Sequence, residues 1–422
     1  MTASETHREI EAVWRIEFTR LVGGLTRLLR DVGVAEELAQ DALVAALEQW
    51  PASGIPRNPG AWLMATAKHR AIDYLRRHAL TDRKHELLGH ELAERENEIP
   101  DFASAIDDHI GDDLLRLVFI ACHPVLSTEA RVALTLRLLG GLSADEIARA
   151  YLVGVPTIAQ RIVRAKRTLA EAHVPFEVPR PAEFTARLSS VLQVIYLIFN
   201  EGYSATSGDD WMRPHLCEEA LRLGRILAEL VPDESEAHGL CALMEIQASR
   251  SQARVGDSGQ PILLMDQDRT RWDQLLIHRG LAALDRAEQL GRKRGPYVIQ
   301  AALAACHARA ASPSDTDWAH IVALYAELAA IAPSPIVELN RAVAVSMAYG
   351  PSAGLELLDT LRDDPALRGY HLLPSVRGDL LRKLGRLKEA RAEFETAASM
   401  TRNARERNLL LERALSCGPA RQ

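Results

Sequence analysis

Residues 142–169, LSADEIARAYLVGVPTIAQRIVRAKRTL, contain the strongest structural signal in the chain. Ser143 is followed three residues later by Glu146, which is the pattern of a capping box. In a capping box the serine hydroxyl and the glutamate carboxylate each bind a backbone amide that would otherwise lack a partner at a helix start. The pattern therefore predicts a helix that begins at Ala144 and ends near Tyr151.

A second helix is predicted directly after a short turn at residues 152–154. Pro156 suits the first turn of this helix, because the N–H that proline lacks would have no helical partner there. Along the helix, apolar residues recur at spacings of four, three and four and form one inward face: Ile158, Ile162, Ala165 and Leu169. Two helices joined by a turn of about three residues are typical of a DNA-binding helix-turn-helix.

The rest of the second helix is polar and carries four positive charges with no acidic residue between Pro156 and Leu169. Arginine can read guanine or hold phosphates, and glutamine can read adenine, so this face suits a major groove. A basic helix on its own is often just a solvated surface, but the capped helix and the tight turn before it favour DNA binding. The candidate DNA-binding residues are Thr157, Gln160, Arg161, Arg164, Lys166 and Arg167.

The N-terminal part contains two further predicted helices with a loop between them. Residues 36–50, EELAQDALVAALEQW, form an amphipathic pattern with an acidic flank. Residues 51–60, PASGIPRNPG, hold three prolines and are predicted not to be helical. Residues 61–77, AWLMATAKHRAIDYLRR, form a second helical pattern that is rich in basic residues.

These motifs resemble those of bacterial extracytoplasmic-function (ECF) sigma factors. The segments 141–148 (GLSADEIA), 155–158 (VPTI) and 164–167 (RAKR), together with Arg161, are similar to the C-terminal DNA-binding region of that family. The resemblance implies a helix-turn-helix that reads the minus-thirty-five promoter element. One departure is Leu152, which stands in the turn where the family usually has glycine.

The resemblance also extends to the N-terminal helices. Residues 36–50 are similar to the family helix that docks on core RNA polymerase, which implies polymerase contacts for Glu37, Gln40, Asp41 and Leu43. Residues 61–77 look like the helix that handles the minus-ten element, where the promoter is melted. Melting requires capture of unstacked bases, for which the candidates are Arg57, Asn58 and Trp62, with Trp62 equally well explained as a core residue. The candidates for holding phosphates are Lys68, Arg70, Arg76 and Arg77.

Charge and proline patterns divide the chain into four parts. Residues 1–85 form the first domain, and residues 86–113 form an acidic linker with ten acidic residues against one arginine. Such a segment suits either a basic polymerase channel or a solvated tether. Residues 114–174 carry the helix-turn-helix, and three prolines at residues 175–181 mark the next boundary.

Residues 183–417 form a C-terminal half of amphipathic helices. One part of it has the glycine, alanine and aromatic spacing of a tetratricopeptide repeat: Gly378, Gly385, Ala390, Phe394 and Ala397. Stacked helical repeats usually present a concave surface to a partner. Residues 192–203 and 209–211, near its beginning, resemble the start of the repeat-like extension of one sigma-factor subgroup. This resemblance implies regulation in cis by an unknown signal or partner.

Composition supports an all-α protein and excludes several classes. The chain has 422 residues, 47% hydrophobic, 25% charged and 5% aromatic, with a net charge of -7. Its longest apolar run, residues 194–199, is too short to cross a bilayer, and we expect a cytoplasmic protein. We expect no cofactor, no metal site and no catalytic motif. The alternative function is a helix-turn-helix regulator with a sensing domain that does not join the polymerase.

Overall fold

The computed structural model describes residues 3–86, 110–151, 153–204, 212–256, 260–291, 293–401 and 403–418. The chain divides into two compact units, unit 1 (1–194) and unit 2 (195–422). The regular elements of the described residues are α-helices and short 3-10 turns, beside one isolated bridge between Val255 and Pro261. The all-α prediction is confirmed.

The N-terminal helices of unit 1 surround a shared apolar core. They are α1 (Ala3–Leu29), α2 (Val32–Ser53) and α3 (Pro59–Glu86). Phe18, Leu25, Trp50 and Leu63 are almost completely buried between them. Asp31 fixes the start of α2, because its carboxylate accepts hydrogen bonds from two backbone amides of the first turn.

The prediction that residues 51–60 are not helical is wrong at both ends. Helix α2 continues through Pro51 to Ser53, and α3 already begins at Pro59. Pro51 lies in the last turn of α2, where Ser53 Oγ donates to the carbonyl of Gln49 at 2.9 Å, and Gly54 follows the helix with a positive φ. Pro59 is tolerated because it stands at the first helical position.

The second part of unit 1 contains the predicted helix-turn-helix. Helix α4 (Ile110–Ala121) packs on α1, and α5 (Thr128–Leu138) packs on α7. The helix predicted from the capping box is α6 (Ala144–Tyr151), and its partner after the turn is α7 (Val155–Glu171). Both predicted helices are confirmed, and Leu152 lies outside the described residues.

Hydrogen bonds confirm how α6 begins. The Ser143 hydroxyl accepts a hydrogen bond from the amide of Glu146 at 3.2 Å. In return, the Glu146 carboxylate accepts from the Ser143 amide at 2.8 Å. The two residues thus satisfy each other's backbone, as the capping box requires.

The acidic linker is shorter than predicted. We expected it to reach residue 113, but α4 begins at Ile110. Asp113 is buried, and its carboxylate lies 3.3 Å from the Arg27 guanidinium and 3.0 Å from that of Arg116. This acid is a structural ion-pair partner, because a buried carboxylate needs paired donors. The rest of the predicted linker, residues 87–109, lies outside the described residues.

Helix α8 (Pro181–Tyr203) spans the division between the units. Its first half packs within unit 1, where Ser190 donates to the carbonyl of Cys122 at 2.8 Å and Arg187 to that of Phe119 at 2.8 Å. Among the described helices it is the one with the length and apolar character that a membrane span needs, a property that buried core helices share.

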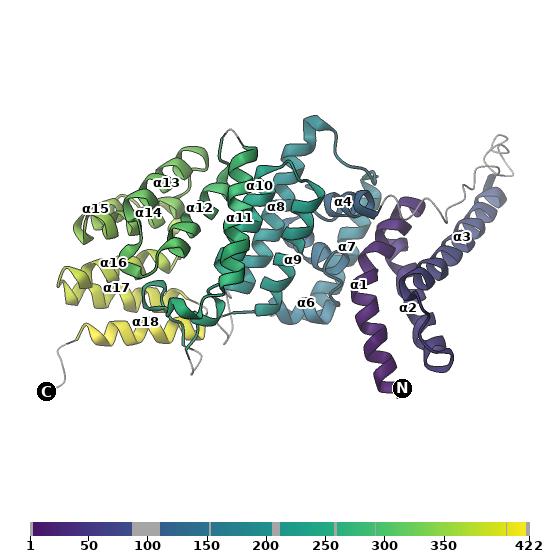
Figure 1. Cartoon of the computed structure of the whole chain (residues 1–422), viewed down its shortest axis with the longest axis horizontal. Helices are drawn as coiled ribbons and strands as arrows, with labels where there is room; N and C mark the ends of the chain where they lie inside the picture. Colours follow the sequence, from purple (N-terminus) through teal and green to yellow (C-terminus); the bar gives the residue numbers. More distant parts are fainter. Residues whose placement is uncertain are drawn as a thin grey trace. The chain divides into compact units, whose positions relative to one another are not determined.

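Unit 2 is a series of helices in which neighbours in sequence lie side by side (Figure 1). After the second half of α8, its α-helices are α9 (Pro214–Leu230), α10 (Ser235–Ala248), α11 (Gln274–Leu290), α12 (Pro296–Arg309), α13 (Trp318–Ile331), α14 (Pro335–Tyr349), α15 (Pro351–Asp359), α16 (Leu372–Lys383), α17 (Leu387–Met400) and α18 (Ala404–Ser416).

Small residues set the contact between α16 and α17. Ala390, Phe394 and Ala397 are fully buried, and a Cβ atom added to Gly378 would lie 2.8 Å from the Phe394 ring. Gly385 has a φ of +75° in the turn between the two helices, which favours glycine. The predicted repeat spacing therefore corresponds to a closely packed helix pair.

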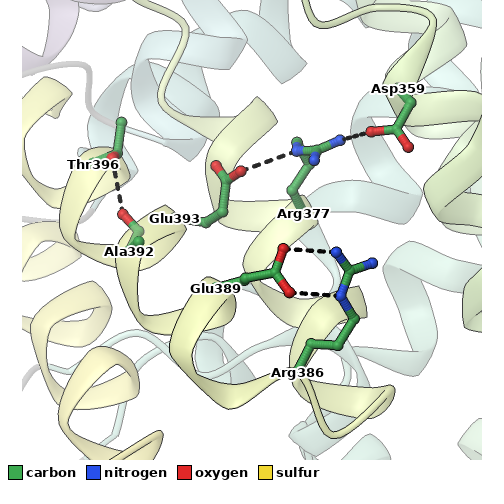
Figure 2. A network of polar contacts seen from close by, with 7 residues as sticks. All are labelled: Asp359, Arg377, Arg386, Glu389, Ala392, Glu393 and Thr396. Atoms are coloured by element: carbon green, nitrogen blue, oxygen red, sulfur yellow. Dashed lines mark hydrogen bonds and ion pairs between the residues drawn. The ribbon is translucent and has the colours of Figure 1, made fainter.

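A buried arginine links three helices of this region (Figure 2). Arg377 on α16 binds Asp359 at the end of α15 and lies 3.1 Å from Glu393 on α17. Burial alone would lower the pKa of Arg377, but its hydrogen bonds to the two carboxylates raise it. The guanidinium therefore stays charged and holds the three helices in register.

We predict that Gly378→Ala destabilises the protein. The added methyl group meets the Phe394 ring, and such overpacking costs about 1–3 kcal/mol. This loss exceeds the gain of about 1 kcal/mol in helix propensity. Urea unfolding followed by circular dichroism should show a lower midpoint. The double variant with Phe394→Leu should recover part of the loss, and an unchanged midpoint for Gly378→Ala contradicts the prediction.

Candidate nucleic-acid interface

Helix α7 turns one face inward and one outward, as its sequence predicts. Ile158, Ile162, Ala165 and Leu169 are buried. The outward residues that the sequence analysis proposed separate into two groups. Thr157, Gln160, Arg164 and Arg167 are exposed, whereas Arg161 and Lys166 are half-buried at the two flanks of the helix. The exposed group forms the candidate DNA-reading face.

The charges on this face are available to a polyanion. Arg167 forms an ion pair with Glu171 at 2.6 Å, but both side chains are exposed. Exposed pairs of this kind contribute little to stability, so a phosphate can replace the carboxylate at small cost. Arg161, on one flank, contributes to lowering the pKa of Glu129 on α5, after the hydrogen bonds from that residue's own amide and from Ser127.

Sequence reasoning missed Val163, which lies on the outward face of α7. Its side chain is 64% exposed, and its exposed neighbours in the helical pattern are Gln160, Arg164 and Arg167. The signal was available in the sequence, because residue 163 falls outside the inward apolar row. An aliphatic side chain on this face adds an apolar contact to an otherwise polar surface.

On the opposite flank, Lys166 is held by Glu36 of α2. Glu36 is almost completely buried, and it also binds Arg137 of α5, with 2.5 Å between Nε and the carboxylate oxygen Oε1. Gln40 donates to the same oxygen at 2.8 Å. We call these four residues the Glu36 cluster.

The predicted polymerase-docking residues lie along α2 with different exposures. Glu37 and Asp41 are exposed, whereas Gln40 and Leu43 are half-buried. Asp41 forms an ion pair at 3.4 Å with Arg70 of α3, which the sequence analysis assigned to phosphate binding. The two predicted surfaces therefore meet at this pair.

The residues predicted to capture bases lie around the start of α3. Arg57 is exposed, and the Asn58 side chain accepts a hydrogen bond from the Ala61 amide at 3.1 Å, so Asn58 caps α3. Trp62 is half-buried, with its ring centroid 5.2 Å from that of the buried Trp50. Asn58 and Trp62 thus both have a structural contact in addition to any role on DNA.

Basic residues follow along α3. Arg76 and Arg77 are exposed, and Lys68 and Arg70 are half-buried. Arg76 lies 3.9 Å from the carboxylate of Asp73, and Arg77 Nε donates to the Asp73 carbonyl at 3.2 Å. These contacts orient two adjacent exposed cations in the second half of α3.

The described residues hold no group of three or more histidine, cysteine or acidic side chains placed to bind a metal. All five cysteines are free thiols. Burial raises the pKa of Cys122 to about 11 and that of Cys217 and Cys241 to about 12. These three thiols stay protonated and unreactive near neutral pH.

Comparison with known families gives matches to three segments. Residues 18–81 match the family described as Sigma-70 region 2, and residues 116–169 match the family described as Sigma-70, region 4. Residues 187–288 match a family of unknown function, DUF6596. The first two matches cover the helices that carry both candidate surfaces.

Comparison with curated proteins gives relatives of two kinds. "Uncharacterized protein R00370" of Rhizobium meliloti (strain 1021) is 44% identical over 386 residues, which cover 91% of this chain and 90% of that protein. The ECF RNA polymerase sigma factor SigK of Mycobacterium bovis (strain BCG / Pasteur 1173P2) is 30% identical over 156 residues, covering 36% of this chain and 78% of SigK. SigK of Mycobacterium ulcerans (strain Agy99) is 28% identical over 155 residues, which cover 36% of this chain and 78% of that SigK.

Proposed function

The chain belongs to the ECF RNA polymerase sigma factors, and from this premise we propose which of its residues perform each step and how it is regulated. As a sigma factor it binds core RNA polymerase and directs it to promoter DNA, where the DNA is melted and transcription begins. Its contribution is binding and positioning, because the core enzyme synthesises the RNA. We place its action in the cytoplasm.

Helix α7 reads the upstream promoter element in this proposal. Its exposed residues Gln160 and Arg164 reach base edges, while Thr157 and Arg167 contact phosphates. Arg161 and Lys166 add positive charge at the flanks. The observation that carries the assignment is the separation of α7 into a fully buried apolar row and an exposed polar row without acids. The stretch without acids runs from Pro156 to Leu169, before Glu171, and Val163 is the aliphatic member of the exposed row. Such a helix presents its side chains to a major groove while the rest of the domain supports it.

Helix α3 and the segment before it handle the melted element. Arg57, Asn58 and Trp62 lie together at the start of α3, where an unstacked base would find a cation, an amide and an aromatic edge. Lys68, Arg70, Arg76 and Arg77 hold the backbone of the strand. Asn58 can serve both as a helix cap and in DNA binding, because its NH₂ group is not used by the cap.

Helix α2 docks on core polymerase. Exposed Glu37 and Asp41 supply negative charge, Gln40 supplies an amide, and half-buried Leu43 supplies an apolar anchor. Charged groups around an apolar contact favour fast and specific association.

We propose the domain boundaries that the sequence predicts, with one refinement. Residues 1–85 and 114–174 are the two DNA-handling domains, joined by the acidic linker, and residues 183–417 regulate them in cis in response to an unknown signal or partner. The refinement concerns α8, whose first half packs in unit 1. A regulator that never joins polymerase, the alternative function, does not explain the match of residues 18–81 to sigma region 2.

We predict that Arg164→Ala weakens promoter binding. The test uses holoenzyme, which is core polymerase with this chain bound, and a promoter selected from a genomic library by in vitro transcription. Loss of an exposed base-reading arginine should lower affinity by about 1–3 kcal/mol, or roughly 5- to 150-fold. Fluorescence anisotropy of labelled promoter DNA measures the change.

Arg180→Ala is the matched control, because Arg180 is an exposed arginine of unit 1 outside the helix-turn-helix. Equal affinities for Arg164→Ala and wild type would remove this residue from recognition. Absence of transcription from every promoter in the library, with core polymerase and the wild-type chain together, would contradict the proposed function itself.

We also predict that removal of unit 2 changes transcription. A variant ending at Val194 keeps the contacts that α8 makes with Cys122 and Phe119. If unit 2 regulates in cis, the amount of RNA made in vitro with this variant should differ severalfold from that made with the full chain. The amount should rise if unit 2 inhibits and fall if unit 2 is required. Circular dichroism checks that the variant is folded, and equal output from both proteins contradicts a regulatory role.

A further inference from the structure

Val163 is an exposed aliphatic residue within the candidate DNA-reading face. Helical geometry places it five residues beyond Ile158 and thus on the side away from the buried row. Its side chain is 64% exposed, so packing within the protein does not account for it. Val163 is surrounded along the helix by the exposed side chains of Gln160, Arg164 and Arg167.

The major groove offers one kind of apolar group, which is the C5-methyl of thymine. Gln160 and Arg164 have the donors and acceptors that read adenine and guanine, and neither can recognise a methyl group. We propose that Val163 contacts the thymine methyl of one base pair in the upstream promoter element and so determines specificity at that position. This inference rests on the proposed promoter binding by α7.

The test replaces single thymines of the upstream element by uracil, which removes the methyl group and leaves the pairing edge unchanged. With wild-type holoenzyme, one substitution should lower affinity roughly fourfold, the effect of exposing about one methyl group. With Val163→Ala holoenzyme, affinity for the thymine promoter should fall by a similar factor, and the difference between thymine and uracil at that position should disappear.

Ile16→Ala is the matched control, because Ile16 is an aliphatic residue of α1 that is 67% exposed. Holoenzyme with Ile16→Ala should lose affinity at the same uracil substitutions, and by the same factors, as wild-type holoenzyme. A Val163→Ala scan identical to the wild-type scan overturns the inference while leaving promoter binding intact. Failure of the wild-type holoenzyme to bind any promoter would instead refute the proposed function.

A separate observation concerns the Glu36 cluster. The Glu36 side chain is 2% exposed, and its two cations come from different helices, Arg137 from α5 and Lys166 from α7. A carboxylate buried to this degree needs cationic partners, because an unpaired charge is costly inside a protein. A further contact joins α1 to the end of α5, where Thr19 donates to the carbonyl of Leu139 at 3.2 Å.

This cluster withholds Lys166 from DNA. The Lys166 side chain is 19% exposed and its charge is neutralised by Glu36. Glu36 also accepts a hydrogen bond from Gln40, which belongs to the proposed polymerase-docking set. The geometry points to a closed state of the free chain in which Glu36 positions Lys166 away from phosphates, and which ends when polymerase engages α2 and Gln40. This second inference also rests on the proposed function.

Glu36→Gln tests the closed state in the full chain without polymerase. Neutralising Glu36 should raise the affinity of the free chain for promoter DNA severalfold and increase the slope of log affinity against log salt by about one, because one more lysine reaches a phosphate. The affinity of holoenzyme should change less, because polymerase binding has already ended the closed state. Glu48→Gln is the control, an exposed glutamate of the same helix.

Lys166→Gln provides a second test if Glu36→Gln fails to fold. It should lower the salt slope of holoenzyme by about one and that of the free chain by much less. If Lys166→Gln changes the salt slope equally in holoenzyme and in the free chain, the closed state is overturned. Equal affinities of free Glu36→Gln and free wild-type chain for promoter DNA overturn it as well. Promoter binding by wild-type holoenzyme, measured in the same series, tests the proposed function independently.

Discussion

The buried row Ile158, Ile162, Ala165 and Leu169 is the constraint on which the DNA-binding surface depends. Because these side chains are removed from water against the neighbouring helices, α7 cannot rotate about its axis without exposing them. This fixes which residues point outward and makes the exposed row of polar residues a rigid surface. A recognition surface needs such support, because misplaced side chains lose their geometry with the bases.

The N-terminal helices show how local backbone chemistry and function coexist. Helix α2 continues for two residues after Pro51, and Pro59 begins α3, so the segment between the helices is shorter than its composition suggests. Asn58 caps α3 and Trp62 packs on Trp50. The residues that the family resemblance associates with base capture are therefore also held in place by the fold.

Unit 2 uses small residues and buried ion pairs to align its helices. Gly378 lets the Phe394 ring approach closely, and Arg377 joins α15, α16 and α17 through two carboxylates. Close packing of this kind fixes the contacts between successive helices of a helical array. Helix α8 begins within unit 1 and continues into unit 2, so one helix belongs to both.

The sequence by itself determined the start of α6, the inward and outward faces of α7 and the family, because capping, helical periodicity and motif spacing are local properties. The outward position of Val163 on α7 also follows from helical periodicity, but the exposure of its side chain is known only from the structure. Only the tertiary structure decided that Glu36 is buried with Arg137 and Lys166, that Asp113 pairs with Arg27, and that α8 packs in unit 1. Glu36 and Arg137 are 101 residues apart, and no local pattern encodes a contact that arises only when separate helices pack together.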